Sequence, residues 1–291
     1  MIPFTRISKA SELKELTDSF MEKSTEELAM DFEEESNLHV YGEHLCIIQL
    51  FDGNNYFIVD ALEIQNEPDG KEALKYFFES PIRKIMFDCS SDSSIVRKTL
   101  GIQLKNIFDI RVLAQGLDFN GNLTALIERN LGIAAEDPAL KKKYQRTNWM
   151  KRPLAEEQLE YALSDVKYLF ELKESLQKEV LGLPLQTQRH LEALIRTCAN
   201  QKHKEKPGWE KICNYKNLNK RQKTFIRYFF KARDELAKKA NVPPTNIVEK
   251  QLLVEMAKNE TWVNILPATK KKYSGTFEKA RLNALCELSC N

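Results

Sequence analysis

Two acidic residues near the start of the chain have the spacing of a pair of metal ligands. Asp31 and Glu33 lie in ELAMDFEEES, a segment whose apolar residues predict a β-strand. Because side chains alternate between the faces of a strand, both carboxylates project from one face, where they repel each other. Oxygen ligands of this kind suit Mg²⁺ or Mn²⁺, so the pair predicts a divalent-cation site. The alternative is an exposed acidic strand end, which the neighbouring Glu34 and Glu35 also permit.

A tyrosine and an aspartate form a second candidate for chemistry. Tyr161 and Asp165 lie in a run whose apolar spacing predicts one long helix over residues 154–181, opened by Pro153. Being four residues apart, they share a face of that helix, roughly opposite its predicted core stripe. An acid beside a tyrosine on a face that packs against other structure needs a partner. The plainer alternative is that the Tyr161 hydroxyl only hydrogen-bonds a neighbouring carboxylate.

A basic run with two aromatic residues precedes that helix. The run KKKYQRTNWMKR, from Lys141 to Arg152, contains Tyr144 and Trp149. Basic side chains hold a nucleic-acid backbone and aromatic rings stack on its bases, so the run is a candidate nucleic-acid contact. A solvated loop whose Trp149 is anchored in the core explains the same pattern.

The composition is that of a globular protein. The chain has 291 residues, 42% of them hydrophobic and 30% charged, which suffices for one large domain or two ordinary ones. No run approaches the ~20 apolar residues of a membrane span, and the acid-containing N-terminal segment without an apolar core predicts no signal peptide. The cysteines are scattered without a CxxC pair, so we expect no zinc or disulfide framework and a reduced, cytoplasmic chain. They are Cys46, Cys89, Cys198, Cys213, Cys286 and Cys290.

The net charge of +2 conceals an uneven distribution. Residues 201–291 contain 20 Lys and Arg against 9 Asp and Glu, a net charge of +11, which leaves residues 1–200 with −9. An acidic part joined to a basic part is typical of a metal-dependent enzyme linked to a module that binds polyanions. Two merely solvated surfaces would give the same counts.

The elements that must position these residues follow from hydrophobic periodicity. We expect helices at 8–23, 71–80, 90–101 and 123–132, strands at 27–32, 45–51, 56–62 and 83–89, and a strand running into a helix at 106–117. The first three strands suggest a meander, and the later alternation of strands and helices indicates an α/β domain with a mixed sheet.

The last third of the chain has a helical pattern throughout. A polar, charged segment at 198–208 predicts a linker. A basic amphipathic helix over 218–240 follows, then a helix after Pro243 capped by Thr245 or Asn246, and a last helix from about Gly275. About 80 residues are enough for a small, independently folding helical domain.

Three motifs in order resemble bacterial ribonuclease D, a tyrosine-type DEDD 3′–5′ exonuclease family. They are Asp31-x-Glu33 followed by the strand YGEHLCIIQL, KIMFDCSSDSSIV with Asp92, and Tyr161-x-x-x-Asp165 preceded by NWMKRPL. The resemblance implies an RNase H-like mixed sheet flanked by helices for residues 1–197. The segment LNKRQKTFIRYFFKARDELAKKANVPPTNIV resembles the helical domain shared by RecQ-type helicases and ribonuclease D, which implies an HRDC-like nucleic-acid-binding domain at 209–291.

The resemblance also implies a reaction. In the family four acids ligate two divalent ions, Mg²⁺ or Mn²⁺, which maps onto Asp31, Glu33, Asp92 and Asp165, while Tyr161 orients or deprotonates the attacking water. A related subclass has His at the Tyr161 position. The third motif contains none of the histidines, which are His39, His44, His190 and His203.

The chain departs from the family pattern in two places. Phe87-Asp88 stands before the second motif, where a His-led or similar small pair is usual, so Asp88 is a reserve candidate for the ligand role of Asp92. The better-known bacterial enzymes carry two helical C-terminal domains, and this chain has room for one.

Three functions are compatible with these residues. The first is a 3′–5′ exoribonuclease that trims structured RNA such as tRNA precursors. The second is a 3′–5′ DNA exonuclease, because helicase-associated relatives use the same active site. The third is a nucleic-acid-binding protein with a degenerate site, against which the intact motif acids argue.

Overall fold

The computed structural model describes residues 2–134, 143–198 and 206–290. The chain divides into two compact units, one of residues 1–35 and 43–202 and the other of residues 36–42 and 203–291. The predicted linker at 198–208 lies mostly outside the described residues, so its role stays a prediction. Within the described ranges, no helix is long and apolar enough to cross a membrane.

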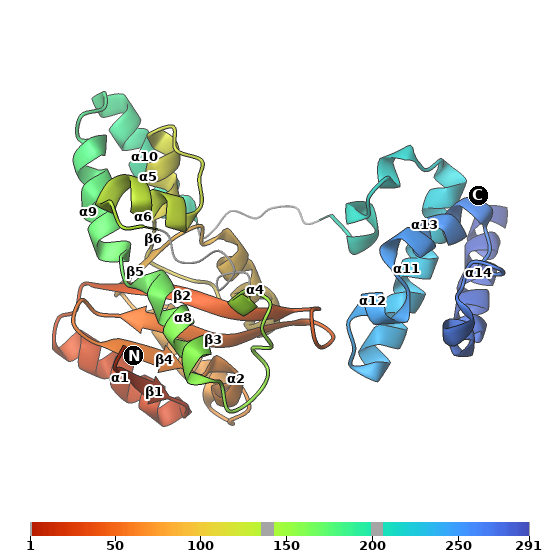
Figure 1. Cartoon of the computed structure of the whole chain (residues 1–291), viewed down its shortest axis with the longest axis horizontal. Coiled ribbons are helices and arrows are strands. Elements are labelled where there is room, and N and C mark those ends of the chain that lie inside the picture. Colours follow the sequence, from red (N-terminus) through yellow and green to blue (C-terminus); the bar gives the residue numbers. More distant parts are fainter. Residues whose placement is uncertain (1, 135–142, 199–205, 291) are drawn as a thin grey trace. The chain divides into compact units, whose positions relative to one another are not determined.

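The first unit is built on a mixed six-stranded sheet, as expected (Figure 1). The strands stand in the order β1-β4-β3-β2-β5-β6, with bounds Phe4–Ile7 (β1), Glu27–Ser36 (β2), Glu43–Phe51 (β3), Tyr56–Val59 (β4), Arg83–Met86 (β5) and Ile107–Asp109 (β6). β3 and β4 pair antiparallel, whereas β1 with β4, β2 with β5 and β5 with β6 pair parallel. The expected meander is therefore β2-β3-β4, and β2 lies inside the sheet between β3 and β5.

Helices surround this sheet. Their bounds are Ala10–Glu22 (α1), Ala61–Ile64 (α2), Gly70–Phe78 (α3), Ser90–Leu100 (α4), Ile110–Gly116 (α5), Leu123–Leu131 (α6), Glu156–Val166 (α8), Leu169–Val180 (α9) and Leu185–Thr197 (α10). Side chains of α1, α3 and α4 share one core cluster with Leu28 and Met30 of β2, while α5, α6, α9 and α10 share another with Ala29. Because these β2 residues alternate between faces, the two clusters cover opposite faces of the sheet.

The prediction of one long helix over 154–181 is wrong. The run is divided into α8 and α9, and the break falls at Lys167 and Tyr168. No proline or glycine stands there, so local propensity does not cause it. The two halves pack on different partners: α8 contacts β3 and β4, and α9 contacts α5, α6 and β5. Tertiary packing thus overrides a continuous helical pattern.

The strand expected over 56–62 ends at Val59, and the short helix α2 follows it. The strand β1 and the helix α10 also escaped the sequence analysis. The strand β1 is short and polar, FTRI, and only Ile7 in it is buried, so it carries little hydrophobic signal. The helix α10 has one buried residue, Leu191, and is defined by its packing against α5 and β6. In both cases the partner element, rather than the local pattern, stabilises the structure.

The second unit is helical. Its elements are Gly208–Lys211 (η2), Tyr215–Asn217 (η3), Lys220–Ala240 (α11), Pro244–Ile247 (α12), Lys250–Asn259 (α13), Ala268–Tyr273 (η4) and Ser274–Ser289 (α14). Asn219 caps α11 by accepting a hydrogen bond from the backbone N–H of Gln222 at 2.8 Å. Phe225, Phe229 and Phe277 are fully buried and join α11 to α14.

The helix expected after Pro243 is interrupted. The short α12 ends at Ile247, and Val248 is extended, with φ −150° and ψ 134°. Glu249 is the N-cap residue of α13, so the prediction of a cap at Thr245 or Asn246 is wrong. Because of the interruption, Ile247 and Val248 both bury their side chains in the helical core. In a continuous helix these two adjacent side chains would point in different directions.

The core of the second unit contains a buried arginine that lacks full hydrogen bonding. Arg233 on α11 is 2% exposed, and its Nε and one terminal nitrogen have no hydrogen-bond partner among the described residues. Its guanidinium lies 4.6 Å from the ring centroid of Phe230, and burial lowers its pKa. Burying a charge without full hydrogen bonding costs stability, so this side chain opposes folding.

Arg233→Met should therefore stabilise the helical unit. Methionine keeps the unbranched apolar stem and removes the buried charge, so we expect a gain of about 1–2 kcal/mol in the free energy of unfolding. Urea unfolding followed by circular dichroism measures it, with the exposed Lys231→Met as the control. A loss of stability in Arg233→Met would show that the guanidinium makes a favourable interaction here.

Candidate active site

The strand β2 carries the first two acids. The expected strand over 27–32 extends to Ser36, so Asp31 and Glu33 both lie within it rather than at an exposed end. Phe32 between them is buried on the opposite face, against Phe78 of α3. By alternation, Asp31 and Glu33 share the face of Ala29, the face on which α9 packs. Their strand lies between β3 and β5, and its pairing with β5 covers Glu27–Ala29, just before Asp31.

The helix α4 carries Asp92 in its first turn. Asp92 is 8% exposed, whereas Ile95, Val96 and Leu100 of the same helix bury their side chains in the core. Gly101 ends α4 with φ +68°, the left-handed conformation that glycine adopts readily. The apolar side of α4 thus fixes the direction in which Asp92 points.

The loop before α4 is held by a buried carboxylate that the sequence analysis did not single out. Asp109, at the end of β6, accepts hydrogen bonds from the backbone N–H groups of Asp88 at 2.8 Å, Cys89 at 3.0 Å and Arg111 at 2.9 Å. Asp88 adopts φ +63°, an unfavourable conformation for a residue with a Cβ. The three hydrogen bonds to Asp109 therefore stabilise the turn that places Asp92.

The helix α8 carries Tyr161 and Asp165 and lies across the sheet, in contact with β3 and β4 (Figure 1). Tyr161 is 8% exposed, and its ring stacks on that of Tyr144 with centroids 5.3 Å apart. The predicted second face of the helix is thus packed against other structure rather than solvated. Asp165 lies one turn further along α8 and remains half-buried.

The basic run before α8 supports this helix. Trp149 is 2% exposed and packs with Cys46 and Ile47 of β3. It is therefore anchored in the core, which was the alternative to a nucleic-acid contact for this residue. Tyr144 supports the Tyr161 ring as described above. Lys141 and Lys142 lie outside the described residues, so a nucleic-acid contact through them stays a prediction.

An ion pair fixes the end of that run. Arg152 donates from Nε and a terminal nitrogen to the two carboxylate oxygens of Asp60, each at 2.7 Å, and Asp60 is 1% exposed. The same guanidinium donates to the carbonyl oxygens of Trp149 at 2.6 Å and Cys46 at 3.3 Å. Such a two-pronged pair has a narrow geometry, so it ties the chain entering α8 to strands β3 and β4.

The electrostatics show that the four acids lie close together. Burial raises the pKa of Glu33 well above the usual range, and the charges of Asp31, Asp165 and Asp92 raise it further. Burial likewise raises the pKa of Asp92, followed by the charge of Asp31. Acids from β2, α4 and α8 therefore share one site, although they are up to 134 residues apart in the chain.

This donor set fits a divalent cation. Buried carboxylates that raise one another's pKa are relieved by a hard cation, and all four side chains offer oxygen. Among the described residues, no three of these acids bring their oxygens within 4.8 Å of one another, as expected for like charges without a counterion. The acids are thus gathered in one region without being collapsed together.

The reserve candidate Asp88 has a different environment. It is 46% exposed, and its carboxylate pairs with Arg111 at 2.9 Å. The charge of Asp92 raises the pKa of Glu33, whereas the charge of Asp88 raises the pKa of Asp92. The geometry therefore favours Asp92 as the acid that faces Glu33.

Glu34 belongs to the surroundings of the site. Burial raises the Glu34 pKa to about 7, and the charge of Glu43 contributes. Glu34 in turn raises the pKa of Asp92. In the sequence it looked like part of an exposed acidic run, because no local pattern reveals that β2 continues to Ser36 with covered faces.

Replacing Asp92 should stabilise the cation-free protein in a pH-dependent way. Since the Asp92 pKa is raised on folding, the folded form binds this proton more tightly than the unfolded chain does, and wild-type stability falls as this carboxyl ionises. The stability gain of Asp92→Asn should therefore grow as the pH rises above about 4, the ordinary pKa of an aspartate. Chemical unfolding in EDTA measures it, with the exposed Glu128→Gln on α6 as control. A stability difference between Asp92→Asn and wild type that does not change with pH would show that folding does not raise the Asp92 pKa.

Removing the Asp109 carboxylate should release the loop before α4. Asp109→Ala leaves three backbone N–H groups without their acceptor, so we expect a loss of roughly 3 kcal/mol in stability. Because Asp92 loses its support, Mn²⁺ affinity should fall about tenfold or more. Urea unfolding and isothermal titration with Mn²⁺ check both, again beside Glu128→Gln. Unchanged Mn²⁺ affinity in Asp109→Ala would show that Asp109 does not position Asp92.

Curated relatives are similar to this chain along most of its length. Ribonuclease D of Haemophilus influenzae is 26% identical over 261 residues, covering 88% of this chain and 63% of that protein. Ribonuclease D of Desulfotalea psychrophila is 25% identical over 254 residues, covering 86% of this chain and 66% of that protein. The chain thus spans slightly less than two thirds of the length of these relatives. The matches confirm the resemblance to bacterial ribonuclease D.

Solved structures share the fold. The catalytic core of RRP6 from Trypanosoma brucei matches with a TM-score of 0.76 at 19% identity, covering 99% of this chain and 81% of that chain. Escherichia coli RNase D matches with a TM-score of 0.68 at 22% identity, covering 96% and 76%. The profile of the family described as 3′–5′ exonuclease matches residues 4–181, which contain all five predicted site residues. By this match over more than half of its length, the chain belongs to the 3′–5′ exonuclease family.

Proposed function

We propose that this chain is a divalent-cation-dependent 3′–5′ exoribonuclease that releases 5′ mononucleotides. The observation that carries the proposal is the meeting of four carboxylates from β2, α4 and α8, which raise the pKa of Glu33 and Asp92, beside a buried tyrosine. Family membership gives the class of reaction, and the relatives named ribonuclease D point to RNA as the substrate.

We assign the cation ligands to Asp31, Glu33, Asp92 and Asp165, and the cofactor to two Mg²⁺ or Mn²⁺ ions. When bound, such a pair of ions lowers the pKa of the attacking water and stabilises the leaving 3′ oxygen. The role of the chain is to hold the four acids in place: Asp31 and Glu33 through the central strand, Asp92 through the loop clamped by Asp109, and Asp165 through α8. Rigid placement of this kind reduces the reorganisation that the reaction needs.

Tyr161 is assigned to the attacking water. Its hydroxyl orients the water or accepts its proton, and stacking on Tyr144 fixes the plane of its ring. The ring packs in the core formed with β3, so it cannot swing freely to solvent. A fixed ring delivers the hydroxyl to one position, which is what a proton-transfer group requires.

The basic helical unit is assigned to the RNA backbone. Residues 201–291 have a net charge of +11, which favours phosphate contacts independent of sequence. We propose that the unit is HRDC-like and holds substrate while the exonuclease unit removes nucleotides. Structured RNA with single-stranded 3′ ends, such as tRNA precursors, in the cytoplasm is the proposed setting.

Digestion of end-labelled RNA tests the proposed activity. With 5′-labelled single-stranded RNA and Mg²⁺ or Mn²⁺, products should shorten one nucleotide at a time from the 3′ end, and EDTA should stop the reaction. Asp31→Asn should abolish it by removing one ligand charge, while Glu128→Gln should leave it intact. Cleavage of a circular RNA would overturn the exonuclease assignment. A preference for single-stranded DNA of the same sequence would establish the DNA exonuclease instead.

The variant Tyr161→Phe tests whether the Tyr161 hydroxyl takes part in the reaction or has only a structural role. The phenylalanine ring keeps the stack on Tyr144 and all four acids remain, so stability should change by less than ~1 kcal/mol and Mn²⁺ affinity should hold. The single-turnover rate should fall about 100-fold or more, because the lost hydroxyl acts mainly in the transition state. Tyr76→Phe, which removes an exposed hydroxyl on α3, is the matched control. A near-normal single-turnover rate in Tyr161→Phe would leave the residue a purely structural role.

A further inference from the structure

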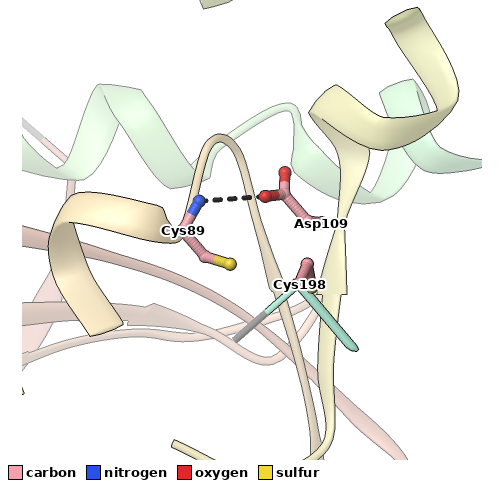
Figure 2. Close-up of side chains that lie close together, drawn as sticks. All are labelled: Cys89, Asp109 and Cys198. Atoms are coloured by element: carbon pink, nitrogen blue, oxygen red, sulfur yellow. Dashed lines mark hydrogen bonds between the residues drawn. The ribbon is translucent and has the colours of Figure 1, made fainter. Parts of the chain in front are cut away.

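Three side chains distant in sequence, none of them one of the four carboxylates, meet in the first unit. Cys89 is the N-cap residue of α4, Asp109 ends β6, and Cys198 follows the last turn of α10. One ligand atom of each lies within 4.8 Å of the ligand atoms of the other two, and Figure 2 shows Cys89 to the left of Asp109 and Cys198 below it. In the described part of the chain, no other three His, Cys, Asp or Glu side chains come together this closely.

All three side chains are buried. Cys89 is 0% exposed, Asp109 5% and Cys198 8%. The Cys89 thiol hydrogen-bonds to Cys198 and to Asp109, and with burial these contacts raise its pKa. The Cys198 sulfur also donates to the carbonyl oxygen of Ile195 at 3.0 Å. Without a metal, the Cys89 thiol thus keeps its proton.

The carboxylate of the cluster is already oriented. The backbone N–H groups of Asp88, Cys89 and Arg111 hold Asp109, and Figure 2 shows the bond from Cys89. Two of these donors reach Oδ1 and one reaches Oδ2, and the lone pair that accepts from the Cys89 thiol becomes free when that thiol loses its proton. Partners of this kind normally orient the ligands of a metal centre.

We propose that Cys89, Asp109 and Cys198 form a binding site for a thiophilic divalent cation of the zinc class, separate from the carboxylate site. Two thiolates with one carboxylate select Zn²⁺ over Mg²⁺ because sulfur is the softer ligand. With Zn–S bonds of about 2.3 Å, ligand atoms at the corners of a tetrahedron stand about 3.8 Å apart. Atoms that already lie within 4.8 Å of one another need only a small movement to reach that spacing.

Binding exchanges protons for the metal. One divalent cation replaces the two thiol protons, which leave to solvent, and the resulting centre of two thiolates, one carboxylate and the cation carries one negative charge. Affinity should therefore rise with pH. Three protein ligands leave the fourth position of a tetrahedron for a water molecule.

A cavity lies next to the cluster. A cavity of about 940 Å³ is lined by Phe108, which precedes Asp109, and by Ile195, whose carbonyl oxygen accepts from Cys198. The same cavity is lined by three acidic residues, Glu26, Glu27 and Glu192, and by three basic ones, Arg83, Lys105 and Arg196. The charge of its lining is therefore balanced, and the proposal rests on the geometry and chemistry of the three ligands alone.

Cobalt(II) bound to the reduced full chain tests the site. With excess Mg²⁺ present to occupy oxygen ligands, Co²⁺ should give a near-ultraviolet thiolate-to-cobalt charge-transfer band, which carboxylates cannot produce. The band should be lost in Cys198→Ser and kept in Cys213→Ser, which alters an exposed cysteine. Zn²⁺ at about 100 times its dissociation constant should raise the melting temperature of the first unit by roughly 5–10 °C, in wild type and Cys213→Ser alone.

Three results would contradict the proposed binding site for a thiophilic cation. One is the absence of the charge-transfer band in wild type. Another is a band or a zinc-dependent stabilisation that survives in Cys198→Ser. The third is a Cys89–Cys198 disulfide in the protein purified without reductant, shown by peptide mapping, because the pair would then be an oxidisable dithiol. None of these readouts depends on nuclease activity, so they leave the proposed exonuclease function untouched.

Discussion

Repulsion among buried carboxylates is the constraint on which the rest of this structure depends. Asp31, Glu33, Asp92 and Asp165 approach closely enough for their charges and burial to raise the pKa of Glu33 and Asp92. Left to themselves, such groups would move apart or take up protons. The surrounding fold keeps the four acids from moving apart. This explains why each acid is attached to an element that is buried and held from several sides.

The supports differ in kind, and each matches the backbone it must hold. The strand β2 lies between β3 and β5, and pairing with β5 over Glu27–Ala29 fixes the backbone that leads to Asp31. The turn before α4 includes Asp88 at positive φ, so it is stabilised by the charged hydrogen bonds that Asp109 accepts. The chain entering α8 is irregular, and the Arg152–Asp60 pair ties it to the sheet. In both of these places charged hydrogen bonds hold an irregular segment.

Asp109 connects two regions of the first unit. Through Asp88 and Cys89 it supports the turn that leads to Asp92, and on its other side it meets Cys198 at the end of α10. A cation held by Cys89, Asp109 and Cys198 would join the start of α4 to the end of α10. The loop that places one acid of the proposed active site would then be tied to the last described residue of the first unit.

The sequence by itself determined the class of fold, most helices and strands, and the five residues to test as the site. Periodicity reports which face of an element is buried, and the order of motifs along the chain survives folding. Only the tertiary structure decided that residues 154–181 form two helices, that β1 and α10 exist, and that Trp149 is a core residue. It also brought Asp109 to the turn before Asp92, Tyr144 to Tyr161 and Cys198 to Cys89. These contacts join residues about 17 to 109 positions apart, and no local pattern encodes them, because they depend on packing between elements rather than on propensity within one.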